Sequence, residues 1–100
     1  MKKDDERLLV DFNQKAQMLF NMAYRNFRLA TKKLDRQLDE NVFQLQVEKF
    51  SVTLKHQLKK IAYDILTISR TSTKMNQFNK QLQETIDIYM KEFRQKIRSL

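Results

Sequence analysis

The sequence predicts an all-α protein. Its 100 residues include no Gly and no Pro, so the residues that tight hairpin turns and bulges favour are missing. The hydrophobic residues, 41% of the chain, recur every three or four positions, which is the spacing of one helix face. This length, together with 32% charged residues, predicts a single helical domain over residues 1–100.

The first helix is predicted at about 4–38. Its apolar stripe runs from Leu9 to Leu38 in steps of three and four residues. Acidic residues at 4–6 lie where carboxylates favour the positive end of a helix dipole, and Lys33 and Arg36 lie near the other end, where cations are favoured.

A turn is predicted at 39–41. Asn41 and Gln44 have the spacing of a capping box, in which each side chain satisfies a backbone amide at the start of a helix. The step from Leu38 to Phe43 also breaks the helical spacing here. The alternative is one uninterrupted helix, because Asn and Asp interrupt helices less strongly than Gly.

The second helix is predicted over about 42–98, because a new apolar register begins at Phe43 and continues to Leu100. The register weakens in residues 69–76, SRTSTKMN, where hydroxyl side chains compete for backbone hydrogen bonds. Two architectures follow. One is an antiparallel helical hairpin with a long second helix of coiled-coil spacing, and the other is a three-helix bundle formed by a break near 69–73.

Several large apolar side chains lie outside these stripes. On a helical wheel they point away from the main stripe of their own helix. The residues concerned are Met18, Met22, Leu29, Leu45, Val52 and Tyr63. A two-helix hairpin would leave them in water, and exposed apolar patches usually mark interaction sites. We therefore predict that they contact a helical partner protein or a second copy of the chain, with Arg25, Arg28 and Lys32 attracting an acidic partner.

The alternative for the same residues is a structural role. In a three-helix fold both sides of the first helix would be covered, and the Met side chains would then serve as flexible core filler.

Catalytic, cofactor and metal sites are not predicted. The chain has no Cys and a single histidine, His56, which lies among lysines without a nearby carboxylate to orient it. Neither a catalytic triad nor a conventional zinc site can be assembled from these residues. We therefore predict a protein that is not an enzyme.

The net charge of +8 supports two further classes of function. Basic patches bind phosphate groups without sequence preference, which would suit a nucleic-acid-associated helical protein. Acidic residues interrupt the basic runs, so we rank this class below protein binding. A self-assembling coiled-coil protein is the third class.

The N-terminal segment MKKDDERLLV is charged, and its apolar run has three residues. We expect neither a signal peptide nor a membrane span. The expected location is the cytoplasm, with export only in the company of a partner.

The size, central turn and helical layout resemble the small helical-hairpin proteins of type VII secretion. Members of that family have a Trp-x-Gly turn, where this chain reads Asn41-Val42-Phe43. Their export signal is an aromatic residue followed four positions later by an acid, where this chain pairs Tyr89 with Phe93. The resemblance implies a divergent accessory member, which acts as a targeting chaperone for the helical N-terminal domain of an LXG toxin.

Overall fold

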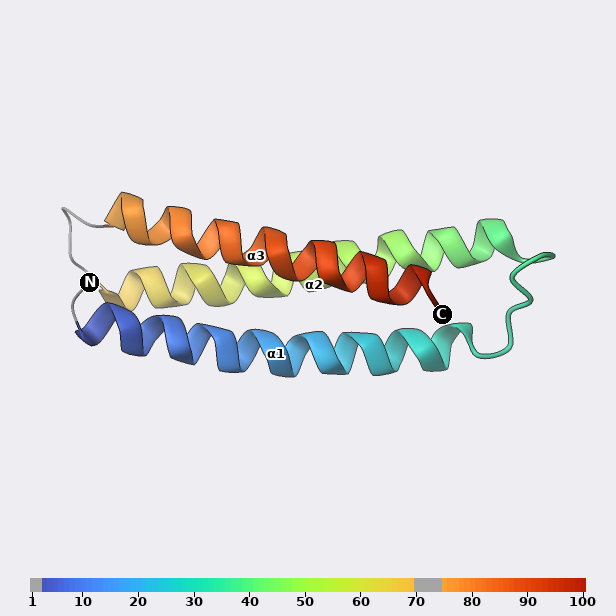
Figure 1. Cartoon of the computed structure of the whole chain (residues 1–100), viewed down its shortest axis with the longest axis horizontal. Coiled ribbons are helices and arrows are strands. Elements are labelled where there is room, and N and C mark those ends of the chain that lie inside the picture. Colours follow the sequence, from blue (N-terminus) through green and yellow to red (C-terminus); the bar gives the residue numbers. More distant parts are fainter. Residues whose placement is uncertain (1–2, 70–74) are drawn as a thin grey trace.

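The described part of the chain folds into three α-helices, which confirms the all-α prediction. The computed structural model describes residues 3–69 and 75–100, with side chains over 6–67 and 77–100. Helix α1 spans Lys3–Thr31, α2 spans Glu40–Ser69 and α3 spans Met75–Arg98. The helices run up, down and up in an elongated bundle of 53 × 19 × 18 Å (Figure 1).

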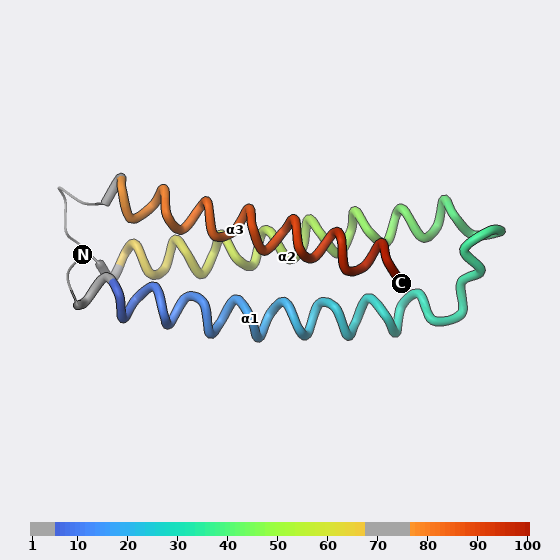
Figure 2. Tube along the Cα trace, viewed as in Figure 1, coloured from blue at the N-terminus to red at the C-terminus, as the bar shows by residue number. Residues whose placement is uncertain are grey.

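The second half of the chain forms two helices, which is the three-helix alternative given above. Figure 2 shows α3 running back along α2, so that it lies parallel to α1. The predicted break near 69–73 falls almost entirely outside the described residues, and the described helices end and begin on either side of it, at Ser69 and Met75.

All three helices contribute to one hydrophobic core. Together with the partly buried apolar side chains packed against it, its members recur at steps of three and four residues along each helix, as the stripes predicted. The buried apolar side chains are Phe12, Ala16, Phe27, Phe43, Val47, Leu54, Leu58, Ala62, Ile65, Phe78, Leu82, Ile86, Met90, Phe93 and Ile97.

Aromatic contacts set how α1 is rotated against its neighbours. The ring of Phe27 meets Phe43 and Phe50 of α2 edge-on, with centroids 5.4 and 5.5 Å away. On the other flank, Phe20 meets Phe93 of α3 in the same way at 5.5 Å. Such pairs contribute beyond the apolar area that they bury, because the positive edge of one ring faces the negative face of the other.

The first helix is shorter than predicted. α1 ends at Thr31, and the chain reverses over residues 32–39, whereas we expected a helix to about 38 and a turn at 39–41. Leu38 shows the consequence, because it was expected in the apolar stripe and its side chain is 85% exposed.

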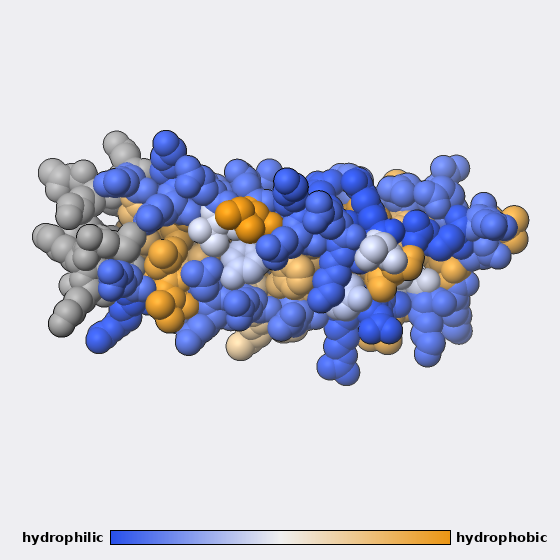
Figure 3. Space-filling view, in the orientation of Figure 1, coloured by the Kyte–Doolittle hydropathy of each residue, from blue (hydrophilic) through white to orange (hydrophobic). Residues whose placement is uncertain are grey.

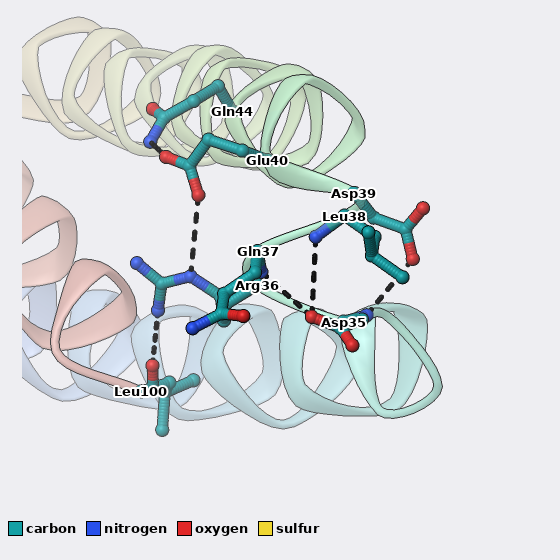
Figure 4. A network of polar contacts seen from close by, with 8 residues as sticks. All are labelled: Asp35, Arg36, Gln37, Leu38, Asp39, Glu40, Gln44 and Leu100. Carbon is teal, nitrogen blue, oxygen red and sulfur yellow. Dashed lines mark hydrogen bonds and ion pairs between the residues drawn. The ribbon is translucent and has the colours of Figure 1, made fainter.

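Asp35 explains why the helical stripe does not continue. Its Oδ1 accepts hydrogen bonds from the backbone amides of Gln37 and Leu38 at 2.8 and 3.3 Å (Figure 4). The amide of Asp35 in turn donates to Oδ2 of Asp39 at 3.0 Å. These local bonds give the backbone partners in a turn separate from α1, which is the usual role of Asp outside helix interiors.

The predicted capping box is wrong. Asn41 lies inside α2, which begins at Glu40. The side-chain amide of Gln44 donates through Nε2 to the Glu40 carboxylate at 2.9 Å, and not to the backbone of Asn41 as a capping box requires (Figure 4). The carbonyl of Asp39 accepts from the Phe43 amide, so Asp39 is the residue just before the helix.

Arg36 connects the loop to both neighbouring helices. Its guanidinium lies 4.0 Å from the centre of the Phe43 ring, and its Nε lies 3.8 Å from the Glu40 carboxylate. Its Nη1 donates to the carbonyl of Leu100, just beyond α3 (Figure 4). One side chain thus links the connection to the first turn of α2 and to Leu100, 64 residues further along the chain.

Asp35→Ala is expected to lower the free energy of unfolding by about 1 kcal/mol, because it removes the acceptor for two amides of the turn. Leu38→Ala is the matched control in the same segment, and its effect should stay within about 0.5 kcal/mol, since the side chain is already in water. Urea titrations followed by circular dichroism measure both. A larger loss for Leu38→Ala would contradict this structure of the connection.

Ser51 is a polar residue inside the apolar core. Its side chain is fully buried, and its Oγ has no hydrogen-bond partner within the described part of the chain. A buried hydroxyl without a partner costs about 1–3 kcal/mol of stability.

Ser51→Ala should therefore raise the free energy of unfolding by about 1–2 kcal/mol, since it removes that hydroxyl and also improves helix propensity. Thr53→Ala is the comparison at an exposed position of the same helix. It removes a hydroxyl that donates to the Lys49 carbonyl at 2.9 Å, so its gain from helix propensity should stay below about 0.7 kcal/mol. Chemical denaturation compares the two. A loss of stability in Ser51→Ala would show that the hydroxyl is satisfied.

Candidate functional site

The predicted contact residues all remain exposed in the folded bundle. Their exposed fractions range from 50% for Val52 to 71% for Tyr63. The structural alternative required the third helix to bury the Met side chains. Met18 and Met22 are exposed, so α3 does not bury them. We call Met18, Met22 and Leu29 the α1 outer strip, and Leu45, Val52 and Tyr63 the α2 outer strip.

The two strips face away from the core on different helices. Phe27 points to α2, and Leu29, two residues later, lies about 200° around the axis of α1. On α2 the same rotation separates Val52 from Phe50, which contacts α1. The six residues thus occupy two surfaces, and one straight partner helix cannot lie along both.

The three predicted cations gather beside Leu29. Arg25, Arg28 and Lys32 line one shallow hollow together with Tyr24 and Leu29, and its volume is about 330 Å³. We call this hollow the basic groove. None of its lining residues is acidic. An apolar side chain and three cations therefore face solvent side by side.

Helix α3 brings a further cation to the edge of the basic groove. The Nζ of Lys96 lies 4.3 Å from the centre of the Tyr24 ring and 5.7 Å from that of Phe20. The guanidinium of Arg28 lies 5.9 Å from the Tyr24 ring. The ion pairs found between described residues involve other groups, so the charge of the groove is not neutralised by them.

A second hollow lies on the outer face of α2. Val52 lines it with Lys55, His56 and Lys59, and its volume is about 230 Å³. The two lysines and the histidine were not among the predicted contact residues. A signal for them is present in the sequence, because residues 49–63 contain lysines and no carboxylate.

Exposed apolar side chains lie beside basic ones on the outer faces of α1 and α2. On the side shown in Figure 3, hydrophobic patches are divided by hydrophilic residues. Ile88 of α3, which lies outside both strips, is also exposed. A partner would therefore meet mixed apolar and charged surface, which is typical of interfaces that form and dissociate.

Clusters of metal-ligating side chains and long apolar spans are two features that the described residues lack. Among them, no group of three or more His, Cys, Asp or Glu side chains is placed to hold a metal ion. None of the described helices has an apolar stretch sufficient to traverse a bilayer.

Tyr89 forms a polar link between α3 and α1. Its hydroxyl donates to Oδ1 of Asn13 at 3.0 Å. Burial raises the pKa of Tyr89 above its usual value of 10.0; the Gln17 side chain opposes this shift, and the nearby Glu92 carboxylate adds to it. Ionisation is thus more costly in the folded chain than in the unfolded one.

The contribution of Tyr89 to stability should be complete below about pH 10 and be lost as the pH rises through its folded-state pKa. Tyr89→Phe removes the hydrogen bond and should cost about 1 kcal/mol at neutral pH. The difference in the free energy of unfolding between Tyr89→Phe and the wild type should then become smaller at alkaline pH. Asn13→Ala removes the acceptor but keeps the Tyr89 phenol, so this variant should still lose stability as the pH rises. Denaturant titrations between about pH 8 and pH 11 test this, and a constant difference would contradict it.

Comparison with known proteins gives no relative. No family model matches the chain, and neither a curated protein nor a solved structure matches it. The function must therefore be inferred from the two outer strips and the charges beside them.

Proposed function

We propose that the protein is a noncatalytic adaptor that binds an acidic amphipathic helix of a larger protein on the outer face of α1. The observation that supports this is the basic groove, in which Leu29 is 62% exposed beside Arg25, Arg28 and Lys32. An apolar anchor surrounded by cations matches a helix that presents apolar and acidic side chains together.

The α1 outer strip offers the apolar part of the contact. Met18 and Leu29 are separated by about 16 Å along the helix axis, with Met22 between them. Burying one such side chain contributes up to about 1.5–3 kcal/mol, and flexible Met side chains adapt to irregular surfaces. Four turns of a partner helix would span this distance with room at each end.

The cations offer the electrostatic part. Arg25 and Arg28 are three residues apart on α1, and Lys32 lies just beyond its end. All three line the basic groove, so their charges lie together beside Leu29. An acidic helix would gain from these charges mainly through faster association and correct register.

Within this class, we propose the helical N-terminal domain of an LXG toxin as the partner and a targeting role in type VII export. The small size of the chain and its all-helical layout support this choice. The adaptor would cover hydrophobic helical surface of the toxin in the cytoplasm and present the toxin to the transport apparatus.

Nonspecific nucleic-acid binding is the second candidate, and the net charge of +8 favours it. It would use the cations but leave Met18, Met22 and Leu29 in water. Binding that is lost with added salt and does not depend on these three residues would favour it over the adaptor.

Met22→Asp and Leu29→Asp should each weaken binding of an acidic partner helix by at least about tenfold, since each places a negative charge in the apolar contact. A suitable probe is a synthetic helical peptide of about four heptads, with Leu and Glu at its contact positions. Amide chemical shifts of residues 18–32 report binding to α1, and coexpression with an LXG N-terminal domain tests the specific partner.

Gln77→Asp is the control, because it adds the same charge at an exposed position of α3. Circular dichroism should show unchanged helicity in all three variants. Unfolding of both α1 variants would assign Met22 and Leu29 to the core, and unchanged peptide binding would exclude the α1 face as the site.

A further inference from the structure

We infer that the outer face of α2 is a second docking surface for an acidic amphipathic helix, so that one molecule holds two helical segments at once. The inference rests on the proposed function, because it assigns the same class of ligand to a separate face.

The first observation is a long stretch of unbalanced charge. Residues 49–63 of α2 contain no Asp or Glu, and they carry the exposed side chains of Lys49, Lys55, Lys59 and Lys60. Across the part of the chain that the structure describes, the ion pairs include none of these lysines. The acid that precedes them, Glu48, is already paired with Arg94 of α3 at 3.0 Å.

The second observation is the spacing of the side chains on this face. The α2 outer strip and the two lysines and one histidine between its members follow alternating steps of four and three residues, which is the spacing of a helix-to-helix contact. The residues along this line are Leu45, Lys49, Val52, His56, Lys59 and Tyr63. At its middle, Val52 lies in the hollow that Lys55, His56 and Lys59 also line.

The apolar and basic side chains along this line indicate which kind of partner fits the surface. A partner helix with alternating apolar and acidic contact positions would cover the apolar residues and meet Lys49 and Lys59 with carboxylates. A nucleic-acid backbone would leave Leu45 and Val52 without a partner. A lipid surface favours a continuous apolar face, which the cations interrupt here.

The two docking surfaces are independent. Val52 lies about 200° around α2 from Phe50, whose ring contacts Phe27 of α1 at 5.5 Å. The α2 outer strip therefore faces away from α1 and from the basic groove. Two helices of one partner, joined by a loop, would bind with the advantage of high effective concentration once the first is docked.

The test titrates the intact chain with the Leu and Glu peptide described above. Two peptides should bind per chain, with amide shifts in residues 18–32 and in residues 45–63. Val52→Asp and Lys59→Glu should each weaken peptide binding at α2 at least about tenfold and leave binding at α1 unchanged. Leu29→Asp should weaken binding at α1 and leave binding at α2 unchanged. Lys59→Glu changes an exposed side chain, so it keeps the test valid if Val52→Asp alters the fold.

Gln77→Asp is again the control and should leave both events unchanged. Binding of a single peptide, with shifts confined to residues 18–32, would overturn the inference and leave the proposed function intact. Shifts confined to residues 45–63 would overturn the proposed function instead. A second peptide, in which Ser replaces every Leu, tests the apolar part of the contact. If it binds to α2 as tightly as the Leu and Glu peptide, the inference is overturned, because the inference gives the apolar residues of α2 a role in the contact.

Discussion

The contact of Phe27 with Phe43 and Phe50 determines how the rest of the molecule is arranged. Phe27 is fully buried, and its edge-on contacts with both rings of α2 fix the rotation of each helix about its own axis. Because Leu29 and Val52 each follow a core aromatic by two residues, the same contact turns both of them outward. The exposed strips are thus a consequence of the core rather than a separate feature.

Helix α3 decides what kind of partner can bind. In a two-helix hairpin, the open flank between the helices would accept a partner. Here Phe93 of α3 packs against Phe20, and Leu82 and Ile86 are fully buried in the shared core. A partner must therefore bind on the outside of the bundle, where apolar and basic side chains lie together.

The cations beside the α1 and α2 outer strips have two effects, which are repulsion between copies of the chain and attraction of an acidic partner. A net charge of +8 keeps molecules of this chain apart, while Leu29 and Val52 remain exposed among cations. The same cations would attract the acidic helix that we propose as the partner. Positive charge beside each apolar strip therefore disfavours pairing with a second copy of the chain, which would bring like charges together, and favours a partner of opposite charge.

The spacing of apolar residues was enough to predict the fold class and the core stripes, because the periodicity of a helix face is local. It also identified the six apolar residues that lie off those stripes, but it left open whether a third helix would cover them, and the folded bundle shows that they are exposed. The tertiary structure was needed to show that α1 ends at Thr31, because the apolar spacing continues to Leu38 while the connection is held by Asp35 and by the contacts of Arg36 with Phe43 and Leu100. It also divided the contact residues between two faces, because the relative rotation of α1 and α2 is set by aromatic contacts between residues far apart in the chain.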